Sequence, residues 1–415
     1  MTVAMPRKSF EATYLTARAA AARLKVTPAT LYAYVSRGLV RSEPGAGRER
    51  RYRAEDIETL ARRRAGDASA ALDWGAPVLD SAITAIAGDR LLYRGIDALR
   101  LAREASVRSV AELLWQAEGS EIFSAENVPP MGPIFLAAAA AARGLPPIER
   151  SLALLPHAAA EDPRASDLAP AAVARTGARL LRLLAAVIAG SSPSPRPVDA
   201  VLSDVWNAGT EGRQLLRAAL VLCADHELNV SAFTVRCVAS AGAAPHLAVL
   251  AGLAALRGRL HGGATERAGV FLENALQFAD VGRALAERLQ RGESFPGFGH
   301  PLYPSGDPRA RLLLALLHEV RSDAAERARQ IATAIAELTG RAPNIDWALA
   351  VLGRHLDLPP GATLGLFALG RTLGWIAHAQ EQYASGRLIR PRARYVGPAA
   401  VEVPKSAGVE RTRSA

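Results

Sequence analysis

The sequence predicts a mainly α-helical protein in which a small basic head precedes a long helical body. Three observations support this fold class: apolar residues recur at three- and four-residue spacing, Ala and Leu dominate while aromatic residues make up only 5%, and positive charge is concentrated near the start. Ala and Leu favour closely packed helices over sheets. With 415 residues, the chain is long enough for two or three domains with sizeable cores.

The charge is unevenly distributed along the chain. Residues 1–66 hold 14 Lys and Arg against six Asp and Glu, a net charge of +8, so the rest carries only +2 of the total of +10. A basic head on a nearly neutral body suggests a separate module with an anionic partner. We place this module at 1–66 and a short linker, rich in small residues, at 67–77.

The head has the pattern of a winged helix-turn-helix. Thr16 can cap a first helix that ends at Leu24, and Thr27 can cap a second over 28–36, because their hydroxyls can accept from early backbone N–H groups. Only two residues separate the helices, as in a tight helix-turn-helix corner, and Gly38 can end the second. Two short strands around the Gly-rich loop of RSEPGAGRERRYR and a helix over AEDIETLARRR are predicted to follow.

This order of elements resembles the MerR and excisionase families, in which the second helix enters the major groove and the wing contacts phosphates. The resemblance implies that the residues facing DNA are Thr27, Ala29, Thr30, Tyr32 and Arg37, with Arg48, Arg50 and Arg51 on the wing. Such binding would depend strongly on salt. The alternatives are that this domain contacts protein, or that it has no operator.

The body is predicted to be almost entirely helical. SAITAIAGDRLLYRG alternates apolar and polar residues around Gly88 and Asp89, which indicates one small hairpin. Later segments have helical periodicity, and several are apolar on nearly every side: 107–118, 134–144, 171–190, 212–228, 230–242 and 246–260. Helices of this kind are buried between others, so we expect layered helices.

The segment FPGFGHPLYPSGDPR, residues 295–309, is a poor helix and a poor strand. Gly297 and Gly299 allow positive φ, and four prolines stiffen the path, so the loop can fix the His300 imidazole in a cleft while Arg309 offers a planar fork to an anion. An ordinary surface turn is the alternative. Two further motifs favour the functional interpretation: GRLHGGATERA around His261 and APNIDWAL around Asp346.

These three motifs together resemble the citrate synthase family, which has a His before paired glycines, a second His in a PGFGH loop followed by GDPR, and an Asp in an NxD segment. The resemblance runs from about 77 to about 398 and includes ADHELNVSAFTVRCVAS and LFALGRTLGWIAHAQEQ. It implies citrate-synthase-like multi-helical domains: a large one over 78–265 and 357–398 and a small one over 266–356. We expect residues 399–415 to form a flexible tail.

The resemblance implies a site that condenses acetyl-CoA with oxaloacetate, without a metal and with no cofactor beyond the acyl-CoA substrate. Its catalytic residues would be His261, His300 and Asp346, and its oxaloacetate-binding residues His226, Arg309, Arg371 and Arg390. Such a condensation needs a carboxylate base and neutral hydrogen-bond donors at the thioester and keto oxygens. A neutral His can be such a donor if a backbone group holds its other ring nitrogen. Arg390 typically reaches in from a partner subunit, so we expect a homodimer.

Two other functions fit the same motifs. Propionyl-CoA could replace acetyl-CoA, giving methylcitrate, because one methylene changes binding by only about 1–3 kcal/mol. The body could instead sense an acyl-CoA or a dicarboxylate for a transcriptional regulator. The chain also departs from many bacterial relatives, which have basic residues where it has Pro301 and Pro304, and from the Asn that is common at the position of Thr265.

The remaining candidate groups are expected to be structural. Five histidines lie outside any motif: His157, His246, His318, His355 and His378. Cys223 and Cys237 have neither metal-ligand spacing nor the context of a nucleophile, so we expect buried thiols in a reducing compartment. With no signal-peptide core and no apolar run of about 18 residues, the chain is expected to be cytoplasmic.

Overall fold

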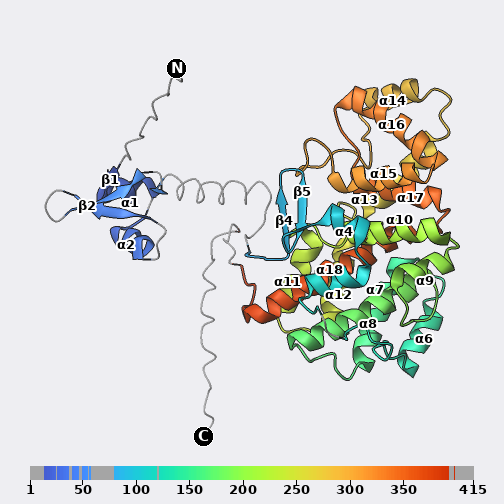
Figure 1. Ribbon diagram of the computed structural model, residues 1–415, viewed down its shortest axis with the longest axis horizontal. Coiled ribbons are helices and arrows are strands. Elements are labelled where there is room, and N and C mark those ends of the chain that lie inside the picture. Colours follow the sequence, from blue (N-terminus) through green and yellow to red (C-terminus); the bar gives the residue numbers. More distant parts are fainter. Residues whose placement is uncertain are drawn as a thin grey trace, which may run out of the picture. The chain divides into compact units, whose positions relative to one another are not determined.

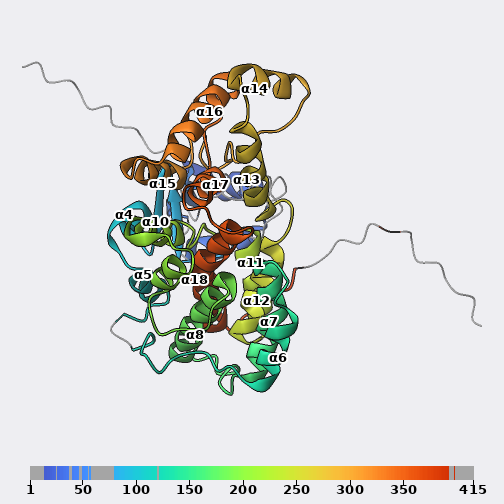
Figure 2. The same ribbon diagram turned by 90° about the vertical axis from the view of Figure 1, so that its right-hand side faces the viewer.

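Helices dominate the computed structural model of the protein, shown in two views in Figures 1 and 2. The structure describes residues 14–24, 26–36, 40–45, 49–54, 56–57, 79–118, 121–391 and 397. The chain divides into two units, Met1–Ser81, here called the head, and Ala82–Ala415, here called the body. The linker predicted at 67–77 and the tail predicted at 399–415 lie outside the described residues.

The head contains the predicted helix-turn-helix. Its helices are α1 (Ala17–Leu24) and α2 (Pro28–Ser36), and its strands are β1 (Tyr14–Thr16), β2 (Ser42–Pro44) and β3 (Arg50–Arg53). Thr16 Oγ1 accepts the Ala19 N–H at 3.3 Å, and Thr27 Oγ1 accepts the Thr30 N–H at 3.3 Å, so both predicted caps are confirmed. Strand β1 was not predicted; it completes an antiparallel sheet of order β1-β3-β2.

Part of the predicted DNA-binding surface falls within the described residues of the head. Tyr32 on α2 is 54% exposed, and Arg50 and Arg51 on β3 are also exposed. The core beneath them consists of Ala20, Ala21, Leu24, Leu31, Val40, Tyr52 and Ile57. Arg37, Gly38, Arg48, the side chain of Ala29 and most of the helix predicted over 54–64 lie outside the described part.

The body begins with the predicted hairpin, formed by β4 (Thr84–Ala87) and β5 (Arg90–Tyr93), to which β6 (Ile96–Asp97) adds a third strand. Gly88 takes φ +59°, the left-handed conformation that the two-residue turn needs. The helices of the body are α4 (Ala98–Glu104), α5 (Val107–Leu114), α6 (Pro133–Ala141), α7 (Pro147–Glu161), α8 (Pro170–Ala189), α9 (Val198–Val205), α10 (Gly209–Leu222), α11 (Val230–Ser240), α12 (Pro245–Leu256), α13 (Gly263–Ala275), α14 (Val281–Gln290), α15 (Pro308–Glu319), α16 (Asp323–Thr339), α17 (Ile345–His355) and α18 (Ala362–Ser385).

The body is built around α18, which packs against α8, α10, α11 and α12. Helices α8 and α18 are buried on nearly every side, and for α8 the apolar sequence of 171–190 predicted this. Helix α17 packs against α13, α15 and α16, and these elements form the upper part of the body in both views. The division of the body into a large and a small domain remains a prediction.

Two further sequence expectations concern burial. Cys223 is buried as expected, but Cys237 keeps part of its surface exposed, because α11 buries the stripe formed by Ser231, Ala232, Val235, Arg236 and Ala239 instead. Within the described ranges, no helix is long and apolar enough to cross a membrane.

Candidate active site

His226 lies in a sharp turn between α10 and α11. The sequence predicted one helix over 212–228, but α10 ends at Leu222. A turn follows it, in which Glu227 adopts φ +55°, and Asn229 then caps the start of α11. Asn229 Oδ1 caps α11 by accepting the N–H groups of Ser231 and Ala232 at 3.1 and 3.2 Å. The turn leaves the His226 side chain buried.

Helix α18 comes very close to this turn and places Arg371 beside it. Gly374 donates its N–H to the carbonyl of Ala224 at 2.9 Å, and a Cβ on Gly374 would collide with that oxygen and with Asp225. Arg371, one turn earlier on α18, is buried and donates from Nε to the Cys223 carbonyl at 2.8 Å. Its terminal nitrogens have no hydrogen bond to other described residues.

The loop 295–309 and the segment before α17 are joined by hydrogen bonds. Gly299 donates its N–H to Ala342 at 2.8 Å, and Asn344 donates its N–H to Gly297 at 2.9 Å. The Asn344 side chain donates from Nδ2 to the Gly299 carbonyl at 3.1 Å, and its Oδ1 caps α17. With φ of +89° and +81°, the two glycines permit this path. The motifs that carry His300 and Asp346 therefore form one structural unit.

His300 is held as a neutral donor. The Leu302 N–H donates to His300 Nδ1 at 3.1 Å, so the proton of the neutral ring lies on Nε2. Burial, and then the positive charge of Arg309, lower the pKa of His300. Its ring centre lies 5.1 Å from that of His226, in an edge-to-face arrangement.

Asp346 lies in the first turn of α17, with its carboxyl group turned towards α13. Thr265 on α13 donates to Asp346 Oδ1 at 2.5 Å, so the residue that departs from the family pattern contacts the predicted base directly. Burial raises the pKa of Asp346, while the Thr265 hydrogen bond and the charge of Arg309 oppose the rise. A carboxylate with a raised pKa is suited to general base catalysis.

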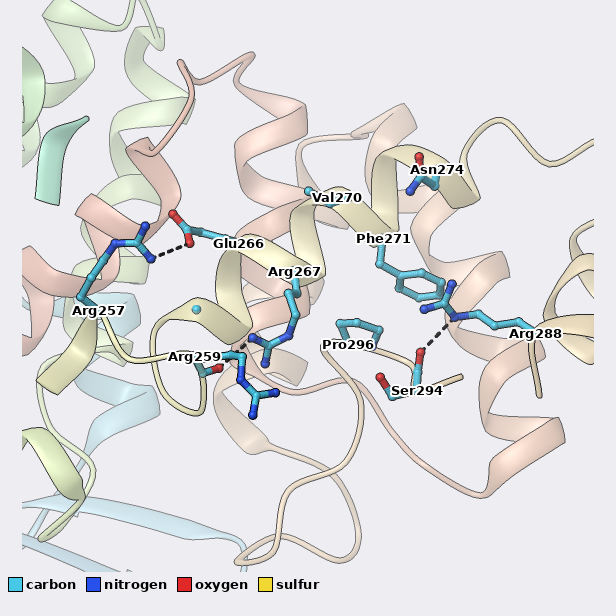
Figure 3. A pocket seen from close by; sticks show the side chains of 11 residues that line it. Arg257, Arg259, Glu266, Arg267, Val270, Phe271, Asn274, Arg288, Ser294 and Pro296 are labelled. Carbon is cyan, nitrogen blue, oxygen red and sulfur yellow. Dashed lines mark hydrogen bonds and ion pairs between the residues drawn. The ribbon is translucent and has the colours of Figure 1, made fainter. Parts of the chain in front are cut away.

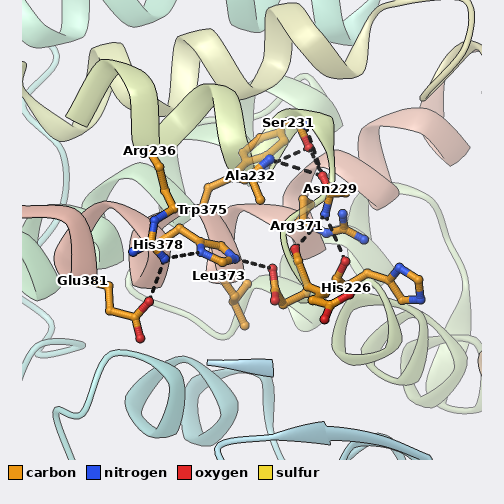
Figure 4. Close-up of polar contacts among 12 residues, drawn as sticks. His226, Asn229, Ser231, Ala232, Arg236, Arg371, Leu373, Trp375, His378 and Glu381 are labelled. Carbon is orange, nitrogen blue, oxygen red and sulfur yellow. Dashed lines mark hydrogen bonds and ion pairs between the residues drawn. The ribbon is translucent and has the colours of Figure 1, made fainter. Parts of the chain in front are cut away.

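His261 is held by a side chain and not by the backbone group that we expected. Its Nε2 lies 2.9 Å from Ser231 Oγ. The Ser231 hydroxyl donates to Asn229 Oδ1 at 2.7 Å and accepts from Trp375 Nε1 at 3.1 Å (Figure 4). Burial, and then the charge of Arg371, lower the pKa of His261 to about 4. The imidazole is therefore neutral near pH 7.

Arg309 is already paired within the chain. Its Nε and Nη2 bind the two oxygens of Asp307 at 3.0 and 2.7 Å, and both side chains are almost fully buried. Asp307 Oδ2 also accepts the Ile345 N–H at 3.1 Å. The sequence predicted an open fork for substrate, but two of the three guanidinium nitrogens are occupied, because the residue two positions earlier can fold back onto it.

Arg390 lies apart from the other predicted site residues. It follows the end of α18 and is exposed. In the described part of the chain, no hydrogen bond or ion pair joins it to the groups above.

A buried row of charged groups runs beneath Arg371 (Figure 4). Asp225 Oδ1 lies 3.3 Å from His378 Nε2, and Arg236 Nη1 lies 3.3 Å from His378 Nδ1 and 2.7 Å from Glu381 Oε2. Glu381 Oε1 accepts the N–H of Ala82, the first residue of the body. Burial opposes ionisation of Asp225, but interactions with His378, Arg371 and Thr84 keep its pKa below the ordinary value.

A pocket of about 590 Å³ lies next to the His261 glycines and the 295–309 loop (Figure 3). Four arginines line it: Arg257, Arg259, Arg267 and Arg288. Arg257 is paired with Glu149 and Glu266, and Arg288 lies over the ring of Phe271 at 4.9 Å and pairs with Glu293. Arg259 and Arg267 form no ion pair with a described carboxylate, although Arg267 donates to the Arg259 carbonyl at 2.7 Å.

Sequence reasoning missed several groups that contact the predicted site residues. These are Ser231, Thr265 in its contact with Asp346, Tyr303 and Asp307. Tyr303 and Asp307 lie inside the quoted loop, but only the fold shows that Tyr303 meets His226 and that Asp307 meets Arg309. Among the described residues, no cluster of three or more His, Cys, Asp or Glu side chains is arranged to hold a metal ion.

The described residues form a multi-helical protein whose layered helices carry three histidines with lowered pKa values, a carboxyl group with a raised pKa and two buried arginines. The chain belongs to the citrate synthase family. Residues 71–392 match the family model described as "Citrate synthase, C-terminal domain", and residues 14–65 match "Helix-turn-helix domain".

Individual relatives agree with this assignment. The chain is 36% identical over 202 residues to "Putative citrate synthase 2" of Mycobacterium tuberculosis, covering 46% of this chain and 54% of that protein, so the match spans about half of the relative's length. It is 33% identical over 357 residues to "Citrate synthase" of Haloferax volcanii, covering 78% and 94%. The solved citrate synthase of Thermotoga maritima MSB8 has 26% identity and a TM-score of 0.66, covering 82% and 98%.

Proposed function

We propose that this protein is a citrate-synthase-type acyltransferase that condenses acetyl-CoA with oxaloacetate, giving citrate and coenzyme A. The observation that supports the proposal is Asp346, a carboxyl group whose pKa is raised by burial and which, like His300, interacts with the charge of Arg309. His261, with its lowered pKa, would be the second neutral imidazole of the proposed site. A base of this kind can take a proton from the carbon beside a thioester while neutral donors stabilise the enol oxygen.

In the proposed reaction, Asp346 removes a proton from the acetyl methyl group and His261 donates to the thioester oxygen. The Ser231 hydroxyl has one proton and two acceptors in reach, Asn229 Oδ1 and His261 Nε2. When it turns to His261, the ring proton lies on Nδ1, which is then the donor. The enol carbon attacks the keto carbon of oxaloacetate, His300 donates from Nε2 to its oxygen, and water cleaves the thioester.

The binding of oxaloacetate would use the cationic groups of the same site. Arg371 offers two terminal nitrogens that have no hydrogen bond to the described residues, Arg309 offers its remaining Nη1, and His226 interacts electrostatically with both. Arg390 would complete the set from a second copy, so the proposed active form is a homodimer. A dicarboxylate suits paired Arg forks because each carboxylate can accept two hydrogen bonds.

Replacing Asp346 with Asn tests the assignment. The variant should release coenzyme A from acetyl-CoA at least about 10²-fold more slowly, because the base is lost. The matched control is Asp323→Asn, which changes an exposed acid in the first turn of α16 and should keep wild-type turnover.

The same thiol-release assay separates the other functions. Turnover that requires oxaloacetate and is faster with propionyl-CoA would make this a methylcitrate-forming enzyme. Binding of both substrates by the wild type without any thiol release would contradict the enzyme assignment and favour a sensor.

The arginine-lined pocket supports acyl-CoA as the thioester. Arg259 and Arg267 can meet the phosphates of coenzyme A, whose anionic groups need cations that are not already paired. These arginines would supply the charge that Pro301 and Pro304 do not. Arg259→Ala with Arg267→Ala should raise the KM for acetyl-CoA about tenfold or more and leave the KM for oxaloacetate within twofold. Arg283→Ala, an exposed change on α14, is the control, and equal effects on both substrates would contradict this role.

We also propose that the head binds DNA, because its helix-turn-helix, its exposed Tyr32, Arg50 and Arg51 and its net positive charge favour an anionic duplex. Binding of the full chain to a library of duplexes should weaken steeply with salt, and Tyr32→Ala should reduce the preference among sequences. The same weak affinity for every duplex would rule out a specific operator.

A further inference from the structure

Tyr303 touches three groups of the proposed oxaloacetate site, yet the reaction described above does not use it. Its side chain is buried, and its hydroxyl lies 2.9 Å from His226 Nε2. Its ring centre is 5.0 Å from that of His300, and Arg309 Cζ lies 5.9 Å from the same ring centre. A side chain in this position can control how both imidazoles face a substrate.

Two consecutive turns hold Tyr303 in place. The Tyr303 N–H donates to the His300 carbonyl at 3.1 Å, and the Gly306 N–H donates to the Tyr303 carbonyl at 3.0 Å. Each is the bond that closes a four-residue turn, and Pro301 and Pro304 occupy the second positions. Proline fixes φ at the value this position needs, so both turns are rigid before a ligand binds.

The hydrogen bonds of this loop also fix where the protons of the two imidazoles lie. Burial lowers the pKa of His226 well below its usual range and raises that of Tyr303 to about 12, so both groups are neutral at pH 7. Among the described residues, His226 Nε2 is the hydrogen-bond partner of the tyrosine hydroxyl. If the hydroxyl accepted from His226, its own buried proton would lack an acceptor. The hydroxyl therefore donates, and the proton of His226 lies on Nδ1.

We propose that Tyr303 is a positioning residue for the keto dicarboxylate substrate: it holds His226 with Nδ1–H free to donate to a substrate carboxylate. The same loop fixes His300 through the Leu302 N–H, which leaves His300 Nε2–H for the keto oxygen. The inference rests on the proposed function for the identity of the ligand. It assigns a role to Pro301 and Pro304, which stiffen the loop where many relatives have basic residues.

Tyr303→Phe in the full chain tests the proposal, because it removes the hydroxyl and keeps the ring. We expect the Kd and KM for oxaloacetate to rise about tenfold or more and the KM for acetyl-CoA to stay within twofold. Nitrogen-15 NMR of the histidines should show His226 losing its fixed tautomer. Tyr383→Phe is the matched control, because the Tyr383 hydroxyl also donates a hydrogen bond, to the Ala243 carbonyl, outside the site.

Substituting the two prolines provides an independent test of the proposal. Pro301→Ala and Pro304→Ala keep every side chain of the site and should raise the Kd for oxaloacetate by about two- to fivefold through loss of rigidity alone. An unchanged Kd in Tyr303→Phe, or equal losses for both substrates, would overturn the proposal. Calorimetry with oxaloacetate alone distinguishes this proposal from the enzyme assignment. If the wild type binds oxaloacetate but releases no thiol, the proposed reaction is wrong and the role of Tyr303 in binding stands. If the wild type does not bind oxaloacetate, both proposals are wrong.

Discussion

At His261 and Asp346, burial is the largest cause of the shifted pKa. At His261, burial lowers the pKa to about 4, and the neighbouring Arg371 adds to the effect. At Asp346 burial acts in the opposite direction on pKa and favours the protonated acid. The same physical cause therefore prepares a neutral donor and a reactive base, because burial disfavours whichever form carries the charge.

A buried histidine outside the site tests this reasoning. Burial lowers the pKa of His246 to about 4, and its Nδ1 has no partner within the described part of the chain. Between pH 6.5 and 4 the unfolded chain takes up a proton here that the folded chain does not, so stability is lost as pH falls. On going from pH 7 to pH 5, the wild type should lose about 2 kcal/mol more unfolding free energy than His246→Gln.

Urea unfolding at the two pH values measures this difference. His318→Gln is the control, because it makes the same substitution at a histidine that is exposed. Equal losses in wild type and His246→Gln would contradict the role of burial.

Among the elements, the close approach of α18 to the His226 turn is what assembles the site. The contact depends on Gly374, which has no side chain to separate the helix from Ala224 and Asp225. It brings Arg371 next to the turn, and Arg236 from α11 and Glu381 from α18 complete the charged row beneath it.

Gly374→Ala should therefore disturb both the fold and the site. We expect unfolding free energy to fall by about 2 kcal/mol or more, since backbone must shift to admit a methyl group, and oxaloacetate affinity to fall with it. Gly269 on α13 has open space around its Cα, so Gly269→Ala should be neutral or stabilising by up to about 1 kcal/mol. Thermal unfolding and calorimetry compare the two, and a Gly374→Ala protein as stable as wild type would contradict the packing argument.

The elements also show what could be predicted from sequence. Periodicity located α5, α6, α8, α10, α11 and α12 and the Gly88 hairpin, and the cap residues of the head were right. Periodicity did not show where α10 stops, because Ala, Asp and His near its end are compatible with a helix and the left-handed Glu227 is a property of the turn. The motifs identified candidate groups, but the pairing of Arg309 with Asp307 and the contact between Tyr303 and His226 depend on tertiary packing.

At the scale of the whole molecule, the proposal that Arg390 acts in the site makes the oligomeric state a testable property. Arg390 is exposed after the end of α18, while the other predicted substrate-binding groups lie inside the body. In the proposed homodimer, Arg390 of each copy would contribute to the site of the other copy.

Mixed dimers test this exchange. Arg390→Ala and Asp346→Asn proteins should each be nearly inactive, but mixing them under conditions that exchange subunits should restore up to about a quarter of wild-type turnover, because half of the dimers are hybrids with one intact site. Light scattering of the wild type gives the oligomeric state. A monomeric active wild type, or hybrids without activity, would contradict a shared site.

The hydrogen bond from Thr265 to Asp346 has a consequence for stereochemistry. Because Thr265 donates to Oδ1, the proposed base has mainly Oδ2 left to accept a proton, and the hydrogen bond fixes the direction in which Oδ2 points. With an acyl chain longer than acetyl, the two hydrogens on the reacting carbon are prochiral, and a base fixed on one side selects between them. The proposed reaction would then remove one of these two hydrogens in preference to the other.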